Sequence, residues 1–124
     1  MKLDSLSLFR LASERMQWLS ARQKVISENI ANADTPGYRA RDVTSFDGYL
    51  SAVAHDGPAA PVGTALPVAT QDAPDTWTTT LSGNTVVLEQ QTVKAGESAA
   101  QYALAANLYK QANMMLTLAA TGKE

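Results

Sequence analysis

A proline–glycine turn follows directly on a long helical pattern, and this break constrains the fold more than any other feature of the chain. The stretch from Ser27 to Tyr38 reads SENIANADTPGY. Proline cannot continue a helix, and it disfavours helical geometry at the residue before it, here Thr35. Pro36 and Gly37 suit the central positions of a type II turn, because glycine accepts the positive φ that the second position needs. The sequence therefore predicts a helix that stops here and a sharp turn around the proline.

The apolar residues before this turn recur at alternating steps of three and four, the spacing of a heptad seam. A polar residue in such a seam fixes register at some cost in stability. We expect residues 1–34 to form a helix, capped by Asp4 or Ser5. On the pattern alone, packing on the core of its own domain is the simpler interpretation of this helix. The seam contains Phe9, Ala12, Met16, Leu19, Gln23, Ile26 and Ile30.

Two asparagines, Asn29 and Asn32, lie three positions apart in the last turn before the break. This spacing places them on neighbouring rows of one helix face. Asparagine is a poor helix former in the interior, but it suits a helix end, where carbonyl groups lack intrahelical partners. We expect the two amides to bond backbone or amide partners, and we favour partners at a subunit contact.

Residues 35–50 are expected to form the turn and an arm that leaves the helix. Residues 38–43 have an extended pattern, and residues 45–50 a short helical or turn pattern. Phe46 and Leu50 are four apart and would share one small apolar face. This face would anchor the returning chain.

Residues 51–84 are expected to be a variable middle, flexible or with short β structure. Ala, Pro, Gly, Thr and Asp dominate residues 51–76, and neither helical nor strand periodicity survives there. Such a composition favours a flexible loop or one ordered by a partner. Asp72 and Asp75 are interpreted as an exposed, solvating pair rather than a catalytic one. The stretch Trp77–Leu81 has strand-like composition, and a turn follows it.

Residues 85–124 are expected to form a second long helix, capped by Asn84 or Thr85. Apolar residues cover most of its circumference from Ala99 onward, and the rest of the chain is too small to bury such a helix. Other chains must therefore provide the cover. The residues expected at this interface are Tyr102, Leu104, Tyr109 and Leu116. The predicted fold class is mainly α, with long N- and C-terminal helices in a coiled-coil-like layer and a Pro/Gly-rich, partly extended or disordered middle.

The side-chain inventory argues against most kinds of chemical site. With no cysteine and one histidine, His55, the chain offers no basis for a thiolate zinc site or for Cys/His or Ser/His catalysis. Its seven glycines are scattered, and its net charge of −2 gives no bulk case for nucleic acid. We expect no enzyme activity, catalytic residue, cofactor, metal, nucleic-acid partner or small-molecule substrate.

The chain also lacks the pattern of a transmembrane segment or a secretory signal. No stretch approaches the roughly 20 apolar residues of a membrane span. Charged residues interrupt the first twenty positions, so there is no apolar signal core. These two observations, taken alone, predict a soluble cytoplasmic protein.

The motifs resemble those of one family of assembly proteins. Residues 27–38 resemble the asparagine-rich helix end and Thr-Pro-Gly-Tyr signature of flagellar rod and hook proteins. RARDV at 39–43, with Phe46, is similar to the proximal rod protein (FlgB) family in particular. SGNTVVLE at 82–89 resembles the start of that family's C-terminal helix. Two residues depart from the pattern: Glu28 replaces a small polar residue, and Val87 replaces an acidic one.

The resemblance implies a structural subunit of the bacterial flagellar proximal rod, in the periplasmic part of the basal body, linking motor to hook for motility. It implies type III export without a cleavable signal peptide. The implied partners are copies of the chain, other rod proteins, the adaptor between the MS ring and the rod, and the export gate. Phe46 and Leu50 would form the short hydrophobic export motif of this class.

The residue patterns and the resemblance agree on one assembly mechanism. The terminal helices would fold together on incorporation and form a coaxial helical layer. The residues of the N-terminal helix expected at this assembly interface, packed against the C-terminal helix and neighbouring subunits, are Phe9, Met16, Leu19, Gln23, Ile26 and Ile30. Two alternatives stay open: another axial rod component, or a cytoplasmic helical-hairpin adaptor that dimerises through its heptad seam. A stable soluble dimer would favour the adaptor.

Overall fold

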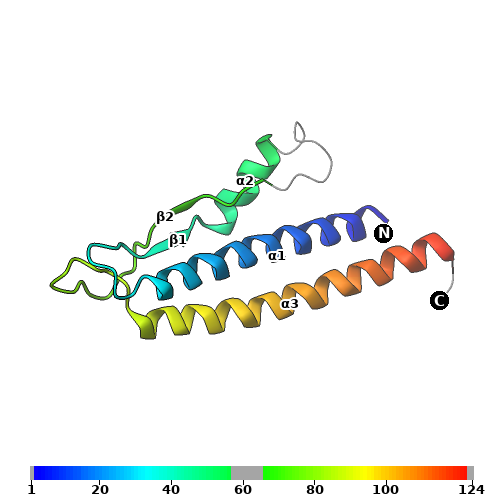
Figure 1. The fold of residues 1–124 in the computed structure, drawn as a ribbon. Coiled ribbons are helices and arrows are strands. Elements are labelled where there is room, and N and C mark those ends of the chain that lie inside the picture. The colour runs from blue at the N-terminus through cyan, green and yellow to red at the C-terminus, as the bar shows by residue number, and fades with distance from the viewer. Residues whose placement is uncertain (1, 57–65, 123–124) are drawn as a thin grey trace.

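Two long antiparallel helices form the body of the molecule, and a short arm lies along one of them (Figure 1). The computed structural model describes residues 2–56 and 66–122. Helix α1 spans Lys2–Ala31 and helix α3 spans Leu88–Thr121, so both termini lie at the same end of the hairpin. The prediction of a mainly α fold with long terminal helices is confirmed.

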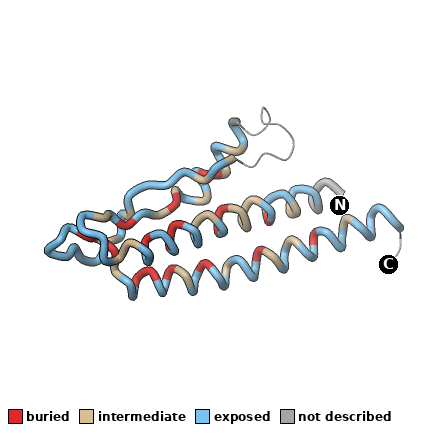
Figure 2. Tube along the Cα trace, viewed as in Figure 1, coloured by how far each residue is buried: buried red, intermediate tan, exposed pale blue. Residues whose placement is uncertain are grey.

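Small and polar side chains line the face of α3 that packs on α1. They recur every seven residues, at Gln91, Ser98, Ala105 and Ala112, and all four are buried (Figure 2). A seven-residue period keeps these side chains on one face of the helix. The small side chains of Ser98, Ala105 and Ala112 let the two helices approach closely.

On α1, the buried seam residues are Ala12, Leu19 and Ile26, which are 3%, 1% and 2% exposed. Near the open end of the hairpin, Phe9 packs on Tyr109 with ring centroids 4.4 Å apart. Helix α1 thus uses much of its predicted seam inside its own chain.

The arm consists of strand β1 (Arg41–Val43), helix α2 (Phe46–Asp56) and strand β2 (Thr70–Asp72). The strands pair antiparallel, with Arg41 opposite Asp72 and Val43 opposite Thr70. Strand β2 therefore lies in the stretch expected to lack regular structure, where its partner strand supplies the order. Part of that stretch, residues 57–65, lies outside the described residues.

The arm is held to α1 by a compact apolar cluster. Trp18 and Val25 from α1 pack with Val43 and Tyr49 from the arm. The indole nitrogen of Trp18 donates a 2.8 Å hydrogen bond to the carbonyl oxygen of Thr44. This cluster fixes where the chain returns after the turn.

The predicted strand at Trp77–Leu81 is wrong. These residues have no regular structure, and Trp77 and Leu81 are exposed. The backbone N–H of Thr80 instead donates to the carbonyl oxygen of Asn84 at 2.9 Å, which closes a local turn. A stretch with strand-like composition forms a strand only where a neighbouring strand pairs with it. No strand lies beside this stretch among the described residues.

Both predicted helix caps are also wrong. Helix α1 begins at Lys2, before Asp4 and Ser5. Helix α3 begins at Leu88 after an extended Val87 that makes no side-chain cap hydrogen bond. Asn84, the expected cap, bonds elsewhere in the chain, as described below.

No helix in the described ranges is both long enough and apolar enough to cross a bilayer.

The turn after α1 has the geometry that the Pro-Gly pair predicts. Gly37 has a φ of 75°, and the N–H of Tyr38 donates to the carbonyl oxygen of Thr35 at 3.2 Å. The N–H of Gly37 donates to Ser82 at 2.9 Å, which ties this turn to the loop before α3. A Cβ atom at Gly37 would meet nothing within 4 Å, so backbone conformation alone requires glycine here.

Gly37→Val is therefore expected to destabilise the turn by about 1–2 kcal/mol, because an L residue resists a left-handed conformation. Urea denaturation of the purified chain measures the loss. Gly96→Val is the control, since Gly96 lies inside α3 with open space around it. A Gly37→Val chain as stable as the Gly96→Val chain would contradict the argument from the turn.

Candidate assembly site

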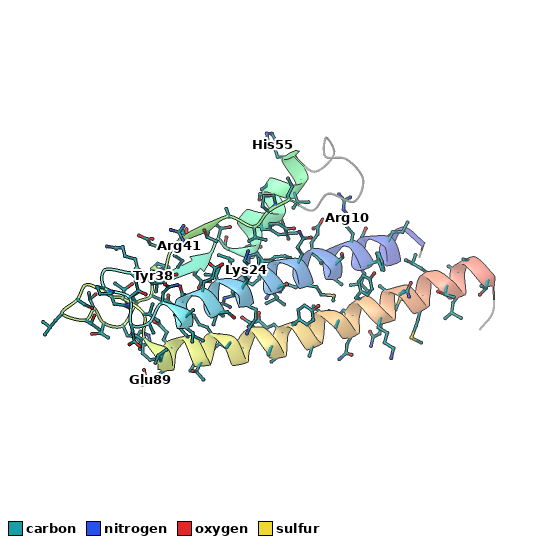
Figure 3. All side chains as sticks on the ribbon, in the orientation of Figure 1. Arg10, Lys24, Tyr38, Arg41, His55 and Glu89 are labelled. Carbon is teal, nitrogen blue, oxygen red and sulfur yellow. The ribbon has the colours of Figure 1, made fainter. Side chains whose placement is uncertain are left out.

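Asn29 joins the end of α1 to both the arm and α3. Two of its partners, Tyr38 in the turn and Arg41 in β1, are labelled in Figure 3. Its side chain is completely buried. The amide nitrogen donates to the carbonyl oxygen of Arg41 at 2.8 Å and to Gln91 Oε1 at 3.0 Å. The amide oxygen accepts from the N–H of Arg41 at 3.0 Å and from the Tyr38 hydroxyl at 3.3 Å. All four hydrogen-bonding positions of this amide are satisfied inside the chain, and a contact of Asn29 with another subunit stays a prediction.

The side chain of Asn32 makes only local bonds, and the residue is half-buried. Its amide nitrogen donates to the carbonyl oxygen of Glu28 at 2.8 Å, within the helix end. Its amide oxygen accepts from the Thr35 hydroxyl at 3.2 Å. These contacts are the bonding of a helix end, which was the other expected role for an asparagine at this position.

Asn84 fastens the loop before α3 to the turn after α1. It is 2% exposed, and its amide nitrogen donates to the carbonyl oxygens of Asn32 at 2.9 Å and Thr35 at 2.7 Å. Its amide oxygen accepts from the N–H of Val86 at 2.8 Å. Asn29 and Asn84 together fix the junction between the two helices and the arm.

A cluster of charges continues this junction along α3. Lys94 Nζ lies 3.3 Å from Asp42 Oδ2 and 2.8 Å from Asp75 Oδ1, and Arg22 Nε lies 3.4 Å from Asp42 Oδ1. The hydrogen bond from Lys94 holds the pKa of Asp75 below its ordinary value, although burial opposes this shift. Gln90 also donates to the carbonyl oxygen of Asp75. Asp75 is thus a structural contact, and the interpretation of Asp72 and Asp75 as a merely solvating pair is wrong.

Asp72 is likewise engaged within the chain. Its carboxylate lies 3.1 Å from Arg39 Nε and 3.8 Å from Arg41 Nη1. Both pairs are largely exposed, so each contributes little to stability.

Phe46, the first member of the expected export pair, lies in an aromatic cluster. Its ring centroid is 5.8 Å from that of Trp18 and 6.3 Å from that of Tyr49. The guanidinium carbon of Arg15 lies 4.7 Å from the Phe46 ring. Leu50 is half-buried on the same helix. In the folded chain this pair therefore has the contacts of a packing anchor.

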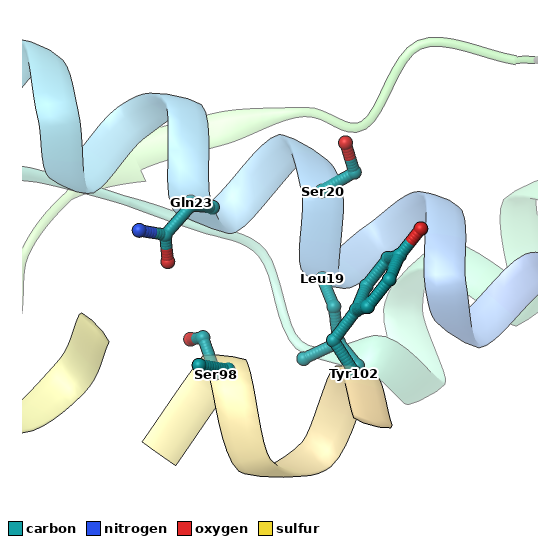
Figure 4. Close-up of a pocket in the computed structure, with 6 residues that line it drawn as sticks. Leu19, Ser20, Gln23, Ser98 and Tyr102 are labelled. Atoms are coloured by element: carbon teal, nitrogen blue, oxygen red, sulfur yellow. The ribbon is translucent and has the colours of Figure 1, made fainter. Parts of the chain in front are cut away.

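The remaining residues expected at an interface fall into two groups. Met16 packs against the core cluster, and Leu116 is half-buried. Four others, Gln23, Ile30, Tyr102 and Leu104, are exposed. Gln23 and Tyr102 line a groove between α1 and α3 with a volume of about 330 Å³ (Figure 4). The other lining residues of this groove are Leu19, Ser20, Ser98 and Ala99.

An apolar stripe runs along the outer side of α3. Leu104 is 62% exposed and Val93 54% exposed, and their flank of the helix also carries Leu108 and Leu118. We call these four residues the α3 stripe. Exposed apolar residues gathered on one flank of a helix in this way mark an interaction surface.

Several residues have roles in the structure that the sequence did not predict. These are the buried polar residues Asn84, Gln90, Gln91, Lys94 and Ser98. The seven-residue spacing of Gln91, Ser98, Ala105 and Ala112 was the available signal for the inner face of α3. The tertiary partners of Asn84 and Lys94, 52 residues away in the chain, had no sequence signal.

The described residues contain no group of three or more His, Cys, Asp or Glu side chains that could hold a metal ion. The features that suit contacts between proteins are the groove and the stripe.

Comparison with known proteins places the chain in a family. Residues 9–39, which include α1 seam residues and the turn, match the family model described as flagella basal body rod protein. A flagellar basal body rod protein FlgB from Agrobacterium fabrum is 36% identical over 126 residues, covering 94% of each chain. FlgB proteins from Yersinia enterocolitica and Escherichia coli are 31% and 34% identical over 82% of each chain. The chain therefore belongs to the flagellar basal body rod protein FlgB family.

Proposed function

We propose that this chain is a structural subunit of the bacterial flagellar basal body rod, built for motility. The structural observation that supports this proposal is the α3 stripe, which one chain of this size leaves uncovered. Burial of apolar area contributes roughly 25 cal/mol per Å². Neighbouring subunits that cover the stripe would therefore be held firmly.

The adaptor alternative is not favoured. It requires the α1 seam to be available for a second chain, but Leu19 and Ile26 are already buried inside this one. A dimer through that seam would first have to open the hairpin.

The finer parts of the proposal concern location and partners. The subunit would reach the periplasmic rod by type III export without a cleavable signal peptide, and would act in its proximal part. It would contact copies of itself, other rod proteins, the MS-ring adaptor and, in transit, the export gate. Its role would be mechanical rather than enzymatic. Residues 1–34 and 85–124 would form the helical layer, and residues 35–84 the arm.

The free ends of the hairpin would gain the most stability when the chain is incorporated into the rod. Leu6 and Leu11 near the start of α1 are exposed, as are Met114 and Leu118 near the end of α3. We expect amide hydrogen exchange in the purified chain to be fast at both ends and slow around Leu19 and Gln91. Uniformly slow exchange would contradict folding coupled to assembly.

Phe46 and Leu50 would serve as the export motif while the chain is unfolded, when the aromatic cluster is open. Phe46→Ala is expected to lower the amount of chain secreted into the periplasm. Val25→Ala is the control, because it removes core packing outside the motif and leaves an unfolded chain free to pass. Equal secretion of both variants, measured by immunoblotting of periplasmic fractions, would leave Phe46 as a packing residue only.

Deletion of the gene tests the main proposal. Cells without this chain should lack complete rods and should not swim, and a plasmid copy should restore both. Electron microscopy of isolated basal bodies and swimming in soft agar provide the two readouts. Normal rods in the deletion strain would refute the proposed function.

A further inference from the structure

The groove and the α3 stripe lie on opposite flanks of α3. Ala105 marks the face of α3 that points at α1. At 3.6 residues per turn, Leu104 lies roughly 100° to one side of Ala105, and Ala99 lies roughly 120° to the other side. The chain therefore carries a raised apolar surface on one flank and a hollow on the other.

The groove has room for aliphatic side chains. Its volume is about 330 Å³, whereas an apolar cavity of about 150 Å³ accepts a benzene molecule. At its floor, the Ser98 hydroxyl is buried without a hydrogen-bond partner among the described residues (Figure 4). The packing of α1 on α3 is thus incomplete at this place.

The charges beside the two surfaces are opposite. Glu97 lies on the stripe flank, four residues after Val93, and Lys24 lies on the groove flank, four residues after Ser20. Neither side chain forms an ion pair with another described residue. The two surfaces therefore carry opposite charges, and neither charge has an ion-pair partner in the described part of the chain.

The two charges also lie at about the same height along the hairpin. Asn29 bonds Gln91 at one end, and Phe9 packs on Tyr109 towards the other. Lys24, five residues before Asn29, is therefore level with the α3 turn that leads to Glu97. A second copy placed alongside with little axial shift would bring its Glu97 to this Lys24.

We propose that the α3 stripe of one copy docks into the α1–α3 groove of the next copy, with Glu97 facing Lys24. This inference rests on the proposed function and names the surfaces through which copies meet. Because the surfaces lie on opposite flanks, the contact is heterologous and continues from copy to copy instead of closing a two-fold dimer. Helix-in-groove docking of this kind is a common mode of recognition.

Thiol cross-linking tests the pairing directly, because the chain has no cysteine of its own. Copies with Ser20→Cys and copies with Leu104→Cys would be expressed together in cells lacking the native gene. Isolated basal bodies would then be treated with a short bifunctional thiol reagent. We expect the mixture to shift to a dimer band, and each variant alone to stay monomeric. Ala103→Cys, on an exposed position between the two flanks, replaces Leu104→Cys in the control mixture.

Three results would overturn the proposal. Ser20→Cys copies that cross-link to one another would show two grooves face to face. Ser20→Cys copies that cross-link only to a protein of another mass would show a different occupant. No cross-link in rods that contain both variants would show that the surfaces do not meet. Basal bodies that contain no copy of the chain would instead contradict the proposed function itself.

Charge reversal provides a second readout. Glu97→Lys and Lys24→Glu should each reduce the swimming zone in soft agar, and the double variant should restore it. An additive loss in the double variant would contradict the pairing of these two side chains.

Discussion

Leu19→Ala is expected to lower the free energy of unfolding of the purified chain by about 2–5 kcal/mol. Leu19 is 1% exposed and belongs to the apolar cluster that joins α1, the arm and α3. Truncation removes buried methyl groups and leaves a cavity that the two helices cannot fully close. Urea denaturation followed by circular dichroism measures the loss.

Leu104→Ala is the matched control for this prediction. It removes the same atoms from a side chain that is 62% exposed. Its effect on the isolated chain should stay within about 0.5 kcal/mol, the usual range for a surface substitution. In cells, Leu104→Ala should weaken assembly even though the subunit stays folded. Equal losses of stability for both variants would contradict the burial of Leu19 within a single chain.

Asn29→Ala is expected to have an effect of similar size, on the order of 3 kcal/mol, because it leaves several buried polar groups without partners at about 1–3 kcal/mol each. The N–H and carbonyl oxygen of Arg41 and the amide oxygen of Gln91 all lose a hydrogen bond. Separation of the arm from α1 should accompany the loss, and limited proteolysis between residues 38 and 45 would detect it.

Asn32→Ala provides the comparison for Asn29→Ala. The substitution is the same and lies three residues away, but the Asn32 side chain bonds only nearby groups at a partly exposed helix end. Its expected cost is below about 1 kcal/mol. If the two variants were equally destabilised, Asn29 would not be the joint that the hydrogen bonds indicate.

The features predicted correctly from the sequence are those that local chemistry determines. The spacing of apolar residues predicts both long helices, and Pro36-Gly37 predicts the turn between α1 and the arm. Propensity failed at Trp77–Leu81, because a strand depends on a neighbour that composition does not reveal.

The contacts of the junction could not be predicted, because they join residues that are far apart in the chain. Gln91 is 62 residues from Asn29, and Lys94 is 52 residues from Asp42. From the sequence alone, local, long-range and intermolecular partners are equally good choices for an asparagine at a helix end. Only the packing of α3 on α1 selects among them.

The separation of the α3 residues into two faces was likewise hidden in the sequence. Alanine is compatible with a buried face and with an exposed one. The expected interface residues Tyr102 and Leu104 both proved exposed, but they lie on different flanks of the helix. The tertiary structure therefore converts one broad apolar helix into a groove side and a stripe side.

The most direct test of the central claim is the labelling of a single thiol at position 104 with a maleimide reagent. Leu104→Cys should be labelled readily in the purified chain, protected in intact basal bodies, and labelled again after the basal bodies are dissociated in acid and returned to neutral pH. This result would show that other subunits cover the outer side of α3 in the rod. Equal labelling in the purified chain and in intact basal bodies that contain it would contradict the account.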